Sequence, residues 1–192
     1  MNRVLIALAA AGLVAAACGG AGSGAATTAP VAVATTAAPT ATPPPSPANT
    51  FIFTADLSPA NENPAIADAE ASGSGTATVT LSIAKDSTGK VIAGNAKFEI
   101  VLKGFPATTM ITISHIHKGD AKTNGSVVLD SGMKATDAIA LTTGGTTITK
   151  DNLTVTPDLA TALLAAPGDY YYNVHSAVHA GGVVRGQLKL KA

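Results

Sequence analysis

The chain has 192 residues, and its 12 lysines and arginines are balanced by 12 aspartates and glutamates, so its formal net charge is zero. This balance, without any run of basic residues, argues against a nucleic-acid-binding protein, because such proteins neutralise phosphates with clustered positive charge. Since there is only one cysteine, an intramolecular disulfide is excluded.

Residues 1–17, MNRVLIALAAAGLVAAA, predict a secretory signal peptide. They combine an early basic residue, an apolar run too short to span a bilayer and a close of small residues. Cys18 follows directly in LVAAACGG, which resembles the lipobox of bacterial lipoproteins, where the cysteine carries a diacylglycerol and becomes the mature N-terminus. We therefore expect an exported protein that is lipid-anchored through Cys18 at the bacterial cell envelope, periplasmic or on the cell surface. The alternative is an ordinary signal peptide followed by an unrelated cysteine.

Residues 18–49 predict a linker. The stretch is rich in Ala, Thr and Pro and contains no charged side chain. It has little apolar surface to bury, so it cannot offset the entropy of ordering itself. We expect it to tether the remaining residues, 50–192, which have the size of one domain.

Residues 50–192 predict an all-β domain, because apolar and polar residues alternate in most segments as in strands with one buried face. In residues 74–83 and 91–104 the expected inward residues are Ala77, Val79, Leu81, Ile83, Phe98, Ile100 and Leu102. Further such segments cover residues 50–57, 110–117, 126–130, 138–149, 169–176 and 182–191. This number and spacing favours an antiparallel β-sandwich.

One short connecting helix is expected after residue 156, in TVTPDLATALLAAPGDY. Thr156 suits the N-cap, Pro157 the first helical position and Asp158 the positive end of the helix dipole. The helix is expected to lie across one end of the sandwich and to cover part of the core.

The four histidines of the chain fall into two pairs, His115 with His117 and His175 with His179. Side chains alternate along a strand, so His115 and His117 point to the same side, and Ile116 between them points into the core. Two imidazoles at this spacing can bind one metal ion. We therefore expect this pair on the outer side or the rim of the sandwich.

The second pair completes a possible four-histidine site if its strand neighbours the first. His175 shares a strand face with Tyr171, which is expected to border the histidines, while His179 follows in a turn. Imidazoles without thiolate favour copper or zinc over calcium or magnesium. The alternative is that all four histidines only form hydrogen bonds in the framework of the fold.

Two other polar residues near these pairs allow more than one interpretation. Asp120 could add a carboxylate ligand, but KGDAKTNG also predicts a solvated turn, which is the preferred interpretation. Arg185 is expected to form a structural ion pair with a carboxylate such as Asp169 or Asp130.

Four blocks together resemble the CHRD domain, which is named after chordin and is common in exported bacterial proteins. The blocks are FTADLSPANENPA, SGSGTATVTL, SHIHKGDAKTNGSVVLDSG and TPDLATALLAAPGDYYYNVHSAVHAGGVVRGQLK, and they span about residues 51–190. The resemblance implies an immunoglobulin-like β-sandwich that is secreted and, in bacteria, without an established enzymatic activity.

The HIH strand is also similar to the copper-binding strand of copper-zinc superoxide dismutases, which are Greek-key β-sandwiches. This similarity would make His115 and His117 copper ligands. Those enzymes also need a bridging histidine, a complete zinc site and usually a disulfide, and the two remaining histidines and single cysteine do not supply these.

Three functions follow from these observations. The leading one is a non-enzymatic, lipid-anchored binding module of the cell envelope that holds copper or zinc through His115, His117, His175 and His179. An alternative is an adhesion or envelope scaffold that contacts a protein or glycan ligand without metal. The third is a copper redox enzyme similar to superoxide dismutase.

Overall fold

The structure is a computed structural model and describes residues 49–192. The predicted signal peptide, Cys18 and the predicted linker up to residue 48 lie outside the described residues. Within residues 49–192, no helix is long and apolar enough to cross a membrane.

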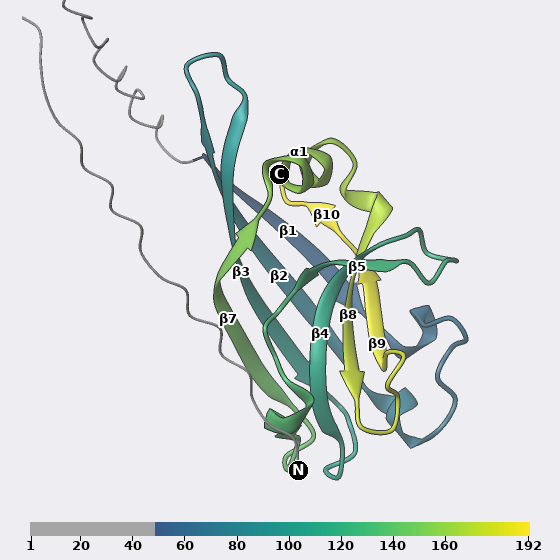
Figure 1. Cartoon of the computed structure of the whole chain (residues 1–192). Coiled ribbons are helices and arrows are strands. Elements are labelled where there is room, and N and C mark those ends of the chain that lie inside the picture. Colours follow the sequence, from purple (N-terminus) through teal and green to yellow (C-terminus); the bar gives the residue numbers. More distant parts are fainter. Residues whose placement is uncertain (1–48) are drawn as a thin grey trace, which may run out of the picture. The chain divides into compact units, whose positions relative to one another are not determined.

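Two antiparallel β-sheets pack face to face (Figure 1). The strands of the first sheet follow the order β10-β1-β2-β3-β7. Their bounds are β1 Asn49–Leu57, β2 Ser74–Lys85, β3 Val91–Lys103, β7 Thr146–Val155 and β10 Lys189–Leu190.

The second sheet has the order β5-β4-β8-β9, and the short strand β6 also pairs with β4. Its bounds are β4 Met110–Lys118, β5 Ser126–Asp130, β6 Ile139–Ala140, β8 Tyr170–Ser176 and β9 Val184–Gln187. The prediction of an all-β antiparallel sandwich is therefore confirmed.

The core lies between the two sheets and contains the inward residues that the alternation predicted. Each of Ala77, Val79, Leu81, Ile83, Phe98, Ile100 and Leu102 is at most 2% exposed. Phe98 of the first sheet meets Tyr172 of the second edge to face, with ring centroids 5.1 Å apart. Burial of these apolar side chains is the main favourable contribution to folding.

The predicted helix forms as α1, Pro157–Ala165, the only α-helix within the described residues. The Thr156 side chain accepts a hydrogen bond from the Leu159 amide and caps the helix, as expected. Ala160 and Leu163 are buried, and α1 lies at one end of the sandwich beside β3 (Figure 1). Short 3-10 turns occur at Pro59–Asn61, Ala69–Ser72, Ala135–Asp137 and Pro167–Asp169.

The outer face of the second sheet is covered as well as its inner face, because every residue of β8 is buried. Parts of three loops lie over this outer face: residues 58–63, 119–125 and 177–183. Asn63 donates a side-chain hydrogen bond to the Lys122 carbonyl at 2.8 Å, and Asn124 donates one to the Asn63 carbonyl at 2.7 Å. The first two loops are thereby joined over the sheet.

Candidate metal centre

The strand β4 places His115 and His117 on the outer face of the second sheet. Ile116 between them is fully buried in the core, as the alternation predicted. The two imidazoles are nevertheless only 8% and 9% exposed, because the loops described above cover them. They therefore point away from the core and still lie in a protein environment.

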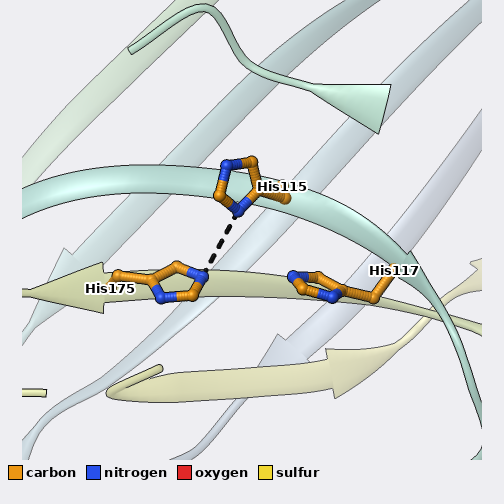
Figure 2. A group of neighbouring side chains, drawn as sticks. All are labelled: His115, His117 and His175. Carbon is orange, nitrogen blue, oxygen red and sulfur yellow. Dashed lines mark hydrogen bonds between the residues drawn. The ribbon is translucent and has the colours of Figure 1, made fainter. Parts of the chain in front are cut away.

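The neighbouring strand β8 brings His175 to the same place. β4 and β8 run antiparallel, and their register sets His115 opposite Asn173 and His117 opposite Tyr171. His175 follows Asn173 by two residues and so lies diagonally across from His115. One ring nitrogen from each of the three histidines lies within 4.8 Å of the others (Figure 2). We call His115, His117 and His175 the trihistidine site.

One nitrogen of each ring forms a hydrogen bond that points out of this site. His117 Nδ1 donates to the Gly125 carbonyl and His175 Nδ1 to the Ala180 carbonyl, each at 2.9 Å. His115 Nε2 lies 3.0 Å from the Asp130 carboxylate. Carbonyl and carboxylate oxygens only accept, so these contacts place a proton on each outer nitrogen. In the neutral rings, the remaining nitrogens therefore carry lone pairs.

The inner nitrogens face one another. His115 Nδ1 and His175 Nε2 are 3.3 Å apart (Figure 2), and the buried His117 Nε2 has no hydrogen-bond partner within residues 49–192. Two acceptors at this distance repel each other unless a proton or a metal ion lies between them. Around an ion with bonds of about 2.0 to 2.1 Å, tetrahedral ligand nitrogens are about 3.3 Å apart, which agrees with the separation of His115 Nδ1 and His175 Nε2.

The environment keeps two of the three imidazoles neutral. Burial lowers the pKa of His175 to about 4, although its hydrogen bond to Ala180 opposes the shift. Burial also lowers the pKa of His117, against the effect of the hydrogen bond to Gly125. Neutral imidazole is the form that binds metal. Both side chains are therefore in the ligand form at neutral pH.

The sequence of the chain matches a known protein family. It matches the CHRD domain over residues 53–188, which is nearly all of the folded part. The chain belongs to the CHRD domain family. No curated protein and no solved structure gives a significant match.

Arg185 supports the trihistidine site of this CHRD domain from the next strand, β9. Its guanidinium lies over the Tyr171 ring, 4.7 Å from the centroid, and Tyr171 stacks on His117 at 4.9 Å between centroids. The Tyr171 hydroxyl accepts a hydrogen bond from the Gly125 amide at 3.1 Å. Tyr171 thus borders the histidines as predicted, and Gly125 links it to the outer hydrogen bond of His117.

The prediction that Arg185 forms an ion pair with Asp169 or Asp130 is wrong. The guanidinium is 1% exposed and donates to the loops over the sheet. Its acceptors are the carbonyls of Asn61, Ala121 and Thr123 and the side chain of Asn124. Asp130 instead contacts His115 from β5. Arg185 forms no such ion pair because its guanidinium lies under the loops, where backbone carbonyls accept its hydrogen bonds in place of a carboxylate.

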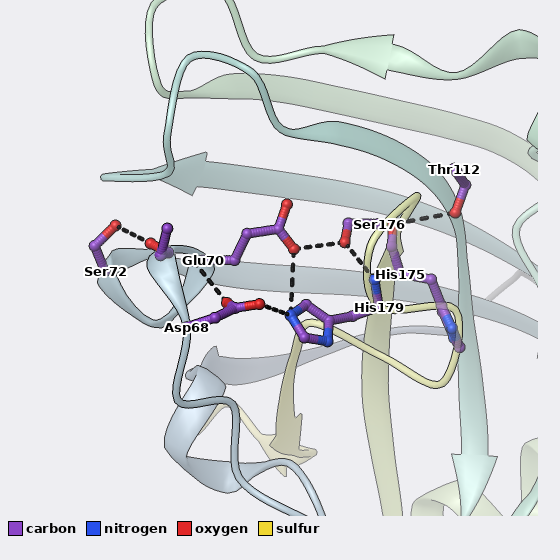
Figure 3. A network of polar contacts seen from close by, with 8 residues as sticks. Asp68, Glu70, Ser72, Thr112, His175, Ser176 and His179 are labelled. Atoms are coloured by element: carbon purple, nitrogen blue, oxygen red, sulfur yellow. Dashed lines mark hydrogen bonds and ion pairs between the residues drawn. The ribbon is translucent and has the colours of Figure 1, made fainter.

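His179 lies elsewhere in the CHRD domain (Figure 3). Its Nε2 is 3.0 Å from Asp68 and 3.7 Å from Glu70, two acidic residues at the 3-10 turn Ala69–Ser72. Ser176 donates to Glu70 at 2.6 Å and accepts from the His179 amide at 3.0 Å. The structure thus brings together three of the four predicted histidines, and it places the fourth where it holds the β8–β9 turn.

Asp120 forms a turn, which agrees with the preferred interpretation. Its carboxylate accepts from the Lys122 amide and from the Thr123 hydroxyl, each at 2.9 Å. These local hydrogen bonds lower the pKa of Asp120, most through the Lys122 amide.

No pattern in the sequence selects Glu62, although the side chain lies near the trihistidine site. It is 9% exposed, and its Oε1 has no hydrogen-bond partner in the part of the chain that the structure describes. Burial raises its pKa to about 7 against the attraction of Arg185. An acidic residue in the polar stretch SPANENPA carries no sequence signal of burial. Only the covering of the second sheet by this loop reveals it.

Proposed function

We propose that this CHRD domain binds one copper or zinc ion through His115, His117 and His175. The observation that carries the proposal is the arrangement of the hydrogen bonds. Each outer nitrogen is held by a carbonyl or a carboxylate, and the inner nitrogens face a common point. Such outer partners orient the imidazoles of metal sites and fix their tautomers.

The donor set limits the choice of ion. Three imidazoles without thiolate suit copper(II), zinc and nickel and do not suit calcium or magnesium, which prefer oxygen. Three protein ligands also leave a coordination position open, as in zinc sites that bind an exogenous ligand. A copper or zinc ion at this site would therefore be accessible to a further small molecule.

The test is equilibrium titration of copper(II) and zinc into the chain beginning at residue 19. This protein keeps the linker and omits Cys18, whose thiol could bind copper independently. We expect one ion per chain. Replacing His117 or His175 by alanine should weaken binding roughly a hundredfold or more, because an outer partner alone is worth 10- to 100-fold.

His179→Ala is the matched control, because it removes a histidine that contacts Asp68 and not the trihistidine site. Its affinity should fall much less than that of the other two variants, because His179 acts on the site only through the turn that carries the Ala180 carbonyl. The proposal is refuted if the unchanged chain binds neither ion, or if all three variants lose the same affinity. The first result would leave an envelope scaffold without metal as the better interpretation.

We further propose that the mature protein is anchored at the bacterial cell envelope by a lipid on Cys18. The support is the lipobox-like sequence LVAAACGG after an apolar leader. The full chain should partition into detergent, and a Cys18→Ser variant should remain in the aqueous phase. Equal partitioning of both proteins would rule out the anchor without affecting the metal proposal.

A further inference from the structure

A cavity of about 300 Å³ lies between the three covering loops, next to residues that hold the trihistidine site in place. Its walls include the chain neighbours of Gly125 and Ala180, whose carbonyls hold His117 and His175. Four of its lining residues are Glu62, Asn124, Gly181 and Gly182. The cavity therefore gives the covered histidines a neighbouring space of the size of a small molecule.

Two buried acceptors meet at this cavity. Glu62 Oε1 and Asn173 Oδ1 have no hydrogen-bond partner among the described residues. A Cβ atom on Gly182 would lie 2.8 Å from the first and 2.7 Å from the second, so a glycine is required between them. Gly182 also has a φ of 131°, which other residues rarely adopt.

Asn173 connects these acceptors to the histidines. It lies opposite His115 in the β4–β8 register, and it shares the outer face of β8 with His175 two residues away. Glu62 lies over Asn173 from the covering loop. The two acceptors are therefore at the edge of the trihistidine site, on the side of the cavity.

Buried acceptors without donors cost free energy, and a ligand that carries donors would remove this cost. We propose that Glu62 and Asn173 bind a small uncharged ligand with N–H or O–H groups at the open coordination position of the metal. Water and ammonia belong to this class. The inference rests on the proposed metal function and adds the chemical class of the exogenous ligand.

The charges around the site distinguish a neutral ligand from an anion or a cation. Above its pKa of about 7, Glu62 is a carboxylate that weakens the attraction of the metal ion for an anion at the open position, and the metal ion itself disfavours a cation. Arg185, the buried cation nearby, directs its donors to loop carbonyls and the Asn124 side chain. His179, which also lines the cavity, directs its Nε2 to Asp68. The unpartnered acceptors of Glu62 and Asn173 therefore favour a neutral hydrogen-bond donor.

The test uses the copper(II)-loaded chain beginning at residue 19, with ammonia and azide as probes at one fixed pH above the pKa of about 7 of Glu62. Coordinated ammonia carries N–H groups, whereas azide is an anion that carries none. Visible and electron paramagnetic resonance spectra report the affinity of each probe. Glu62→Gln should weaken ammonia binding and strengthen azide binding, changing the ratio of the two affinities about tenfold or more, as a charge-assisted hydrogen bond does.

Glu99→Gln is the matched control, because Glu99 is exposed on β3 of the first sheet. It should leave the ratio unchanged, and both variants should bind copper as the unchanged chain does. If copper binds normally and Glu62→Gln leaves the ratio unchanged, the inference is wrong and the metal proposal stands. If the unchanged chain binds no copper, the metal proposal fails and the inference fails with it.

Discussion

Lowering the pH is expected to destabilise the metal-free CHRD domain through His175. Burial holds the pKa of this imidazole at about 4, below its ordinary value of 6.5. Between these values the unfolded chain binds a proton that the folded domain does not bind, so protonation favours unfolding. Stability is therefore present above pH 6.5 and is lost as the pH falls towards 4, where the folded imidazole also becomes protonated.

The size of the loss follows from the two pKa values. Their separation, 6.5 minus about 4, is about 2.5 pH units, and each corresponds to about 1.36 kcal/mol, so His175 should contribute about 3 kcal/mol. This is a large part of the 5 to 15 kcal/mol that is typical of a domain.

The assay is urea unfolding with a metal chelator at several pH values between about 7 and 4, for the unchanged chain and for His175→Gln. Carboxylates contribute to the pH dependence of both proteins, so their effects largely cancel in the comparison. The unchanged chain should lose about 3 kcal/mol more than the variant. Parallel pH profiles would refute the reasoning, because they would mean that burial does not hold His175 neutral.

Two further predictions concern the surroundings of the trihistidine site. Asp130→Asn should weaken copper or zinc binding about tenfold, which is the lower end of the range for outer partners. The effect is small because the Asp130 side chain that contacts His115 is 58% exposed. Titration of the two ions measures the affinity, and an unchanged affinity would contradict this prediction. Arg185→Lys should lower the free energy of unfolding by roughly 2 to 4 kcal/mol, because an ammonium cannot reproduce the planar set of buried hydrogen bonds and the contact with Tyr171. In the same unfolding assay, Lys189→Ala removes only an exposed ion pair and should lower the free energy of unfolding by less than about 1 kcal/mol. An equal loss of stability in both variants would contradict the role of Arg185.

The parts of the fold that local sequence determines could be predicted. Period-two alternation identified the inward residues of β2 and β3, and it correctly placed Ile116 in the core between two outward histidines. Thr156 and Pro157 correctly marked the start of α1. These features depend on residues that are close in the chain, so their physical causes are visible in the sequence.

The grouping of the histidines depends on the register of two strands, which no local pattern contains. His175 lies within β8 and His179 only three residues beyond its end, yet only His175 lies on the outer face of the sheet beside β4. His179 lies beyond the end of β8 and finds Asp68 from a distant turn. A shift of one residue in the pairing would turn the side chains of a strand to the opposite face, so the site depends on register as much as on composition.

The partners that prepare the imidazoles for metal are still less visible in the sequence. Two of them, Gly125 and Ala180, use backbone carbonyls, so their residue type carries no information about the contact. Gly125 ends a loop that Arg185 holds over the second sheet, and Ala180 lies in the β8–β9 turn that His179 and Ser176 hold. In the sequence, Arg185 indicates only a cation that needs a carboxylate. Because His175 is buried beside the β8–β9 turn, and the Ala180 carbonyl of that turn orients its ring, its covered position explains both its low pKa and its readiness to bind a metal ion.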